Sequence, residues 1–202
     1  MKKAMGLLLA VLMLVAAFSI LPIHGEAQIY DSVIRLHVLA ASDSDKDQAL
    51  KLVVRDAVLE KTSTLLANVD TRDEAETVLA HSLDEIRTVA ADTVRAAGAS
   101  DAVTVTLGNE EYPTRSYESL AFPAGEYLSL RVMIGEAAGQ NWWCVLFPPL
   151  CLSAATSKAE AEQAFLSAGL TEEQYRIITD SDSTKYKLRF KLLEVMEELL
   201  RD

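Results

Sequence analysis

The sequence predicts an α+β fold, with a mixed or mostly antiparallel sheet in the order β-α-α-β-β-β. A helical hairpin covers one face of this sheet, and further helices follow at the C-terminus. Three observations support this fold class. Ile34, Leu36 and Val38 alternate with other residues, as in a strand with one buried side. Two segments with apolar residues at helical spacing come next. Three segments rich in β-branched or aromatic residues then precede the helical tail.

The boundaries of these elements follow from capping and breaking residues. Ser44, with Asp47 three residues later, has the pattern of a helix N-cap, and Thr71 is expected to cap a second helix. Gly108 and Asn109 are expected to end the second strand. In chain order we expect a strand at 29–41, helices with apolar stripes from Leu50 to Leu65 and from Ala75 to Val94, strands at 102–107, 126–134 and 142–147 with an ordered loop at 112–125 before the third, and helices at 158–168 and 186–200.

Charge and length exclude several classes of protein. The 202 residues include 19 Lys and Arg against 30 Asp and Glu, which gives a formal net charge of −11. A nucleic acid would be repelled by this acidic chain. Docking on an anionic membrane through a basic patch is excluded for the same reason. The length and the 50% hydrophobic content allow a real core. Membrane contact is therefore expected only through the N-terminal segment.

Residues 1–27 have the features of a secretory signal peptide. Lys2 and Lys3 precede an uncharged stretch, Ala4–Leu21, and small residues at positions 25 and 27 predict cleavage after Ala27. The apolar stretch is also long enough to act as an uncleaved membrane anchor. In both alternatives the positive end stays inside and the rest of the chain is exported.

Export determines how the two cysteines are interpreted. Cys144 and Cys151 flank Pro148-Pro149, which can reverse the chain between them. In an oxidising compartment such a pair is most simply a disulfide, and two buried free thiols are the alternative. A zinc site would need two more ligands, and no histidine has a suitable spacing. We therefore expect neither a metal nor a cofactor.

Catalytic motifs are not evident in the chain. His37, Ser42 and Asp43 could be arranged as a hydrolytic triad, but no G-x-S-x-G motif is present. H-E-x-x-H, a glycine-rich phosphate loop and paired Asp-Thr/Ser-Gly motifs are also missing. The sequence therefore predicts a protein that is not an enzyme. An exported hydrolase that uses His37 and Asp43 is the less favoured alternative.

The unusual feature is the aromatic segment 141–151. Neighbouring residues of a strand alternate, so one of its two tryptophans should point away from the core, and exposed aromatic residues often dominate protein binding. Two alternatives are that both rings are buried under the trailing helices, or that they stack on sugar rings in an envelope- or peptidoglycan-binding module. The candidate partner-binding residues are Trp142, Trp143 and Phe147, with Arg35, His37 and Arg115 as further choices.

Several motifs resemble the stage II sporulation protein R family of endospore-forming Firmicutes. The resemblance covers about residues 34–152. The run Asn-Trp-Trp-Cys-Val-Leu-Phe-Pro-Pro-Leu-Cys at 141–151 is long enough to be highly specific. The other motifs lie at 34–43, 47–52, 54–58, 112–115, 120–127 and 131–135.

The resemblance implies an intercellular signal and not a catalyst. Members of this family are made in the forespore and exported into the space between the two sporulation membranes. There they trigger a membrane-embedded aspartic protease of the mother cell, which processes pro-sigma-E. The expected domain organisation is a signal peptide or anchor at 1–27, a signalling domain at 28–152 and a helical extension at 153–202.

Overall fold

The computed structural model describes residues 26–117, 120–149 and 158–179 of the chain. The described residues fall into two compact units. The larger contains residues 30–111 and 126–171, and the smaller contains described parts of 1–29, 112–125 and 172–202. The elements are α2 (Glu26–Ser32), β1 (Ile34–Leu39), α3 (Asp45–Leu65), α4 (Arg72–His81), α5 (Leu83–Ala96), β2 (Val103–Tyr112), β3 (Arg115–Tyr117), β4 (Leu120–Phe122), β5 (Gly125–Ile134), β6 (Asn141–Phe147), α6 (Lys158–Ser167) and α7 (Glu172–Thr179).

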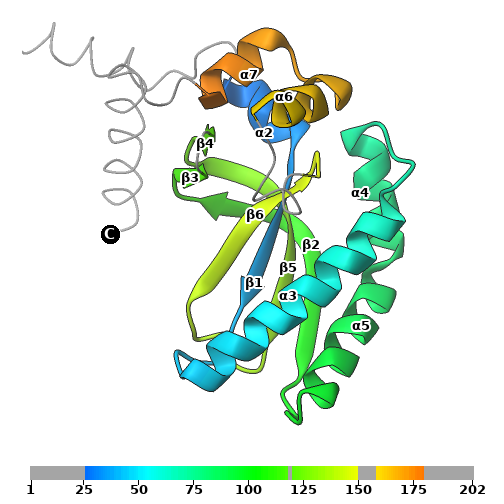
Figure 1. Cartoon of the computed structure of the whole chain (residues 1–202), viewed down its shortest axis with the longest axis vertical. Helices are drawn as coiled ribbons and strands as arrows, with labels where there is room; N and C mark the ends of the chain where they lie inside the picture. The colour runs from blue at the N-terminus through cyan, green and yellow to red at the C-terminus, as the bar shows by residue number, and fades with distance from the viewer. Residues whose placement is uncertain (1–25, 118–119, 150–157, 180–202) are drawn as a thin grey trace, which may run out of the picture. The chain divides into compact units, whose positions relative to one another are not determined.

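The larger unit is built on a four-stranded mixed sheet with the strand order β2-β5-β1-β6. Strand β1 pairs in parallel with β5 and antiparallel with β6. Helices α3, α4 and α5 lie against one face of this sheet (Figure 1). The predicted α+β class, with a mixed sheet covered by helices on one face, is confirmed.

The core lies between the sheet and these three helices. Ile34, Leu36 and Val38 of β1 are fully buried there, as their alternation predicts. Their partners on β5 in the parallel register also belong to the core. The helices contribute apolar residues from one side each, including Val54, Val58, Leu79, Ile86 and Ala90. Burial of these side chains is the main stabilising term of the unit.

The predicted N-cap of α3 is confirmed, with one addition. The Ser44 hydroxyl accepts a hydrogen bond from the Asp47 backbone N–H at 3.2 Å. The Asp47 carboxylate, however, accepts from the Ser42 hydroxyl at 2.5 Å, and Ser42 in turn accepts from the Ser44 N–H at 3.2 Å. In a standard capping box the side chain at the Asp47 position would accept directly from the Ser44 backbone N–H. Here the Ser42 hydroxyl lies between them: it accepts from the Ser44 N–H and donates to the Asp47 carboxylate.

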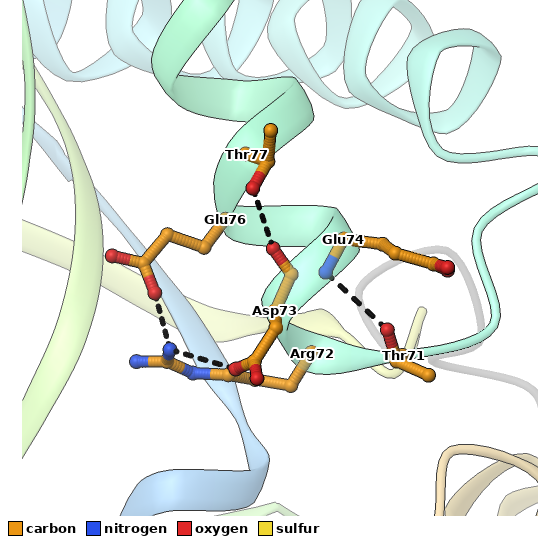
Figure 2. A network of polar contacts seen from close by, with 6 residues as sticks. All are labelled: Thr71, Arg72, Asp73, Glu74, Glu76 and Thr77. Atoms are coloured by element: carbon orange, nitrogen blue, oxygen red, sulfur yellow. Dashed lines mark hydrogen bonds and ion pairs between the residues drawn. The ribbon is translucent and has the colours of Figure 1, made fainter.

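The cap of α4 also follows the prediction (Figure 2). Thr71 precedes the helix, and its hydroxyl accepts from the Glu74 backbone N–H at 3.3 Å. Acidic residues in the first turn complement the positive end of the helix dipole. The first turn is fixed further by side-chain contacts among Arg72, Asp73, Glu76 and Thr77.

Three predicted boundaries were wrong. The first strand begins at Ile34 and not at position 29, because Glu26–Ser32 forms a helix. The second helix is interrupted at Ser82, which ends α4 and starts α5 with a ψ of 7°. Strand β2 continues through Gly108 to Tyr112, since pairing with the equally long β5 offsets the low strand propensity of Gly and Asn.

The smaller unit contains elements that the sequence did not predict. The expected loop at 112–125 holds a short antiparallel hairpin, in which Ser116 of β3 pairs with Ala121 of β4. Helix α7 contacts β4 and was not predicted. In the larger unit, α6 matches the helix expected at 158–168. The helix expected at 186–200 lies outside the described residues, as do residues 1–25 of the expected signal segment.

The turn between β5 and β6 is held by the loop that follows β1. The Gln140 backbone N–H donates to the Asp43 carboxylate at 2.7 Å, and the Gly139 N–H donates to the Ala40 carbonyl at 3.0 Å. The buried Lys51 ammonium donates to the Gln140 carbonyl at 2.9 Å. Burial lowers the pKa of Lys51, partly opposed by Asp43. These contacts fix the position at which β6 begins.

Replacement of Gly139 tests this packing. A Cβ at position 139 would lie 2.2 Å from the Ser42 carbonyl oxygen, so Gly139→Ala must displace the loop. We expect a loss of about 1–3 kcal/mol in the free energy of unfolding, as for other overpacked sites. The matched control is Gly108→Ala, where no atom lies within 4 Å of the new Cβ. Urea unfolding of both variants checks the prediction, and equal stabilities would contradict it.

Candidate protein-binding site

The two adjacent tryptophans lie on opposite faces of the sheet. Trp142 pairs across β1 with Val38, which belongs to the core, so Trp142 lies on the helix-covered face. There the guanidinium of Arg55, from α3, is 4.9 Å from the centre of the Trp142 ring. Trp143 pairs with His37 and therefore lies on the other face, which we call the second sheet face. Both tryptophan side chains are half-buried.

His37 lies at the centre of a polar cluster on the second sheet face. Its Nδ1 atom is 2.9 Å and 3.0 Å from the two carboxylate oxygens of Glu110, on β2. Its Nε2 atom is 2.9 Å from the Oδ1 atom of Asn141, on β6. The Trp143 ring lies against the imidazole, with ring centres 5.2 Å apart and planes tilted by 36°. Arg131, on β5, adds an ion pair to Glu110 at 3.2 Å.

We call these five residues the second-face cluster: His37, Glu110, Arg131, Asn141 and Trp143. Each of the four strands contributes to it, which explains how residues far apart in sequence meet. His37 is only 5% exposed, whereas Asn141 is exposed and Trp143 and Arg131 are half-buried. The cluster is therefore a buried polar support beneath a partly exposed aromatic and amide surface.

The electrostatics of Glu110 follow from its neighbours. Burial alone would raise the pKa of this carboxyl, but the hydrogen bond and charge of His37 oppose that effect and, together with two weaker contributions, outweigh it. Arg131 and the hydroxyl of Ser129 act in the same direction. The pKa of Glu110 is therefore held below its ordinary value, and the group is a carboxylate at neutral pH.

The hydrolase alternative has no geometric support in this structure. His37 uses its two nitrogens on Glu110 and Asn141, not on Asp43. Asp43 accepts instead from the Gln140 backbone, and the Ser42 hydroxyl donates to Asp47. Within the described ranges, no group of three or more His, Cys, Asp or Glu side chains could hold a metal ion. In the described part of the chain, His37, Ser42 and Asp43 therefore make separate contacts and are not assembled as a triad.

The other candidate contact residues have different positions. Phe147 is buried in the core. Arg35 is fully buried on the second sheet face, where its Nε donates to the Cys144 carbonyl at 3.2 Å and its guanidinium lies 5.1 Å from the Tyr127 ring centre. Neither residue can be an exposed contact in this structure. Arg115 is half-buried on β3 of the smaller unit.

The predicted disulfide is only partly visible. Cys144 is buried on β6 and is disulfide-bonded, and the described part of the chain has no free cysteine. The other cysteine of the expected pair, Cys151, lies outside the described residues. The pairing of these two cysteines therefore stays a prediction.

Sequence reasoning missed three members of the cluster. Arg131 and Asn141 could have been found by aligning the alternation of β5 and β6 with that of β1, because all three strands were predicted. Glu110 could not, since the second strand was expected to end at Leu107, before this residue. Glu110 lies on β2, which is separated from β1 by β5, so its approach to His37 is visible only in the folded sheet.

The fold and the cluster define a small α+β domain that presents a half-exposed aromatic side chain on a rigid polar support. The chain belongs to a sporulation protein family: the family model for stage II sporulation protein R matches residues 30–157. It is also 41% identical over 134 residues to stage II sporulation protein R of Bacillus subtilis (strain 168), a match over 66% of this chain and 60% of that relative. No solved structure matches the chain.

The family match covers most of the larger unit and the 112–125 segment of the smaller one, and it ends before α6 and α7. It begins at the α2 helix and runs past β6, so it includes the sheet, the helices α3–α5 and the second-face cluster. None of the described helices combines the length and the apolar character that a bilayer crossing requires. The expected signal or anchor segment precedes the matched residues.

The Glu110 carboxylate gives a pH-dependent prediction. We expect Glu110→Gln to lower the free energy of unfolding at pH 7 by about 1.5–3 kcal/mol, because a charge-assisted hydrogen bond to a buried histidine is lost. The folded pKa lies below the ordinary value of 4.5. The stabilisation by Glu110 is therefore present above pH 4.5 and is lost as the pH falls through the folded pKa.

The measurement is urea unfolding of both proteins between pH 7 and pH 3. The stability difference between wild type and Glu110→Gln should shrink as the pH falls below 4.5. Glu111→Gln, at the exposed neighbouring position of β2, is the control and should leave stability within about 0.5 kcal/mol. A difference that stays constant down to pH 3 would show that Glu110 acts by packing and not by its charge.

Proposed function

We propose that this protein is an exported sporulation signal that activates a membrane-embedded aspartic protease, which then processes pro-sigma-E in the mother cell. The single observation that carries this proposal is membership of the stage II sporulation protein R family over residues 30–157. The lysine-led apolar segment at the N-terminus supports export across the forespore membrane into the intermembrane space.

The structure supports a binding mechanism for this activation. The second-face cluster offers an indole ring held against a buried imidazole, with an exposed amide beside it. Rigid aromatic side chains of this kind supply large contact area with little loss of side-chain entropy. Binding is productive when the partner's active arrangement is bound more tightly than its inactive one. No bond needs to be made or broken by this chain.

The contact surface can be narrowed from the six residues expected at first. Trp143 is the principal candidate because it is half-exposed and lies directly on the polar support. Trp142 is the second candidate, with Arg55 of α3 against its ring. Phe147 and Arg35 are internal residues that support the strand β6 and are not offered as contacts.

Co-expression in a non-sporulating bacterium tests the proposed function. The full chain would be produced together with the membrane protease and pro-sigma-E, and conversion of the precursor would be followed on a blot. Processing that requires this chain and its N-terminal segment is the expected result. If the protein is shown to be folded and exported but no processing occurs, the proposal is wrong. Binding to purified peptidoglycan would then favour an envelope-binding module.

Substitution of Trp143 tests the contact surface. We expect Trp143→Ala to reduce processing about 30-fold or more, because loss of a central aromatic contact typically weakens binding by 2 kcal/mol or more. The control is Val53→Ala, which removes a 52% exposed apolar side chain from α3. Circular dichroism confirms that both variants are folded. Full processing by a folded Trp143→Ala variant would remove this residue from the contact surface.

A further inference from the structure

The acceptors around His37 indicate which protonation state of its imidazole ring can satisfy them. Oxygen atoms lie within 3.0 Å of both ring nitrogens: the Glu110 carboxylate at Nδ1 and the Asn141 Oδ1 atom at Nε2. A neutral imidazole carries only one N–H and can donate at one nitrogen, whereas the imidazolium donates at both. With the Oδ1 atom of Asn141 turned toward Nε2, as here, both acceptors are satisfied only by the protonated ring.

We propose that the protonated His37 ring is the positioning group that fixes Trp143 for partner binding, and that loss of this proton rearranges Asn141 and displaces Trp143. This inference rests on the proposed function in one respect, namely that Trp143 is a contact for the partner. If the inference is right, the position of the Trp143 ring depends on pH.

Two contacts transmit the state of His37 to Trp143. The first is through Asn141, which begins β6 two residues before Trp143 and is bonded to Nε2. If Nε2 loses its proton, the amide must turn to donate its NH₂ group or lose the bond. The second is direct, because the two rings are cross-strand neighbours 5.2 Å apart. A cation this close to an indole is attracted by its ring electrons, and a neutral imidazole is not attracted in the same way.

The charged groups around His37 make Glu110 the controlling residue. Glu110 faces the ring from β2, and Arg131 faces Glu110 from β5. Arg35 lies on the same face of β1, two residues before His37. From β6 the ring meets Asn141 and Trp143, which carry no charge. Among the described residues at the cluster, Glu110 thus supplies the negative charge that balances an imidazolium close to two guanidinium groups.

The test is a pH titration of the full chain, purified in a mild detergent and followed by NMR between pH 5 and pH 8.5. The two indole N–H resonances are assigned with Trp142→Phe. We expect the Trp143 resonance to shift together with the ring resonances of His37, while His37→Gln abolishes this shift. His81→Gln, at an exposed position of α4, is the matched control and should leave the shift unchanged.

Glu110→Gln supplies a readout that a merely structural role would not change. In Glu110→Gln the Trp143 resonance should no longer follow pH as it does in the wild type, because the Nδ1 atom of His37 has lost its carboxylate partner. A Trp143 resonance that does not vary with pH in the wild type would overturn the inference. So would a shift that persists unchanged in His37→Gln.

The co-expression assay separates this inference from the proposed function. We expect His37→Gln to reduce processing several-fold in a protein shown to be folded, and His81→Gln to process like the wild type. If the wild type supports no processing, the proposed function fails, and the NMR titration alone still decides whether His37 positions Trp143. If the wild type processes and a folded His37→Gln does so equally well, the positioning role is wrong.

Discussion

The structure depends on the burial of strand β1 on both of its faces. All six residues of this strand are buried, although two of them, Arg35 and His37, carry polar side chains. A polar group that leaves water must find partners in the protein, and a charged group must find charged or strongly polar ones. The polar contacts of the second sheet face are therefore those that provide partners for Arg35 and His37.

The partners of Arg35 and His37 come from strands on either side of β1. Arg35 donates to the backbone of β6, and His37 connects Glu110 on β2 with Asn141 at the start of β6. These contacts run across the strands. They therefore favour one register of β1 with its neighbours more strictly than apolar packing alone would. The loop after β1 reinforces the same register, because it binds the turn that leads into β6.

The alternation and capping patterns predicted the fold well because both are local properties of the chain. Ser44 and Thr71 begin their helices as expected, and β1, β5 and β6 lie close to their predicted positions. The candidate site was predicted less completely. The sequence indicates that one tryptophan leaves the core, but only the register with Val38 and His37 shows which one. Arg35 was expected to be accessible because the alternation of β1 was interpreted as one buried and one solvated side. The complete burial of Arg35 shows that this interpretation was wrong.

The position of Trp143 relates this architecture to the proposed function. A partner that binds a flexible tryptophan must also supply the free energy to order it, and this cost lowers affinity. Here the backbone of the ring is fixed by β6, one side of the ring lies against His37, and His37 is itself held at both nitrogens. The side-chain entropy of Trp143 is thus lost when the domain folds and not when a partner binds. Under the proposed function, the domain in this way presents one well-defined aromatic contact to its partner, and the inference on His37 adds that the buried charges beneath the ring decide when that contact is available.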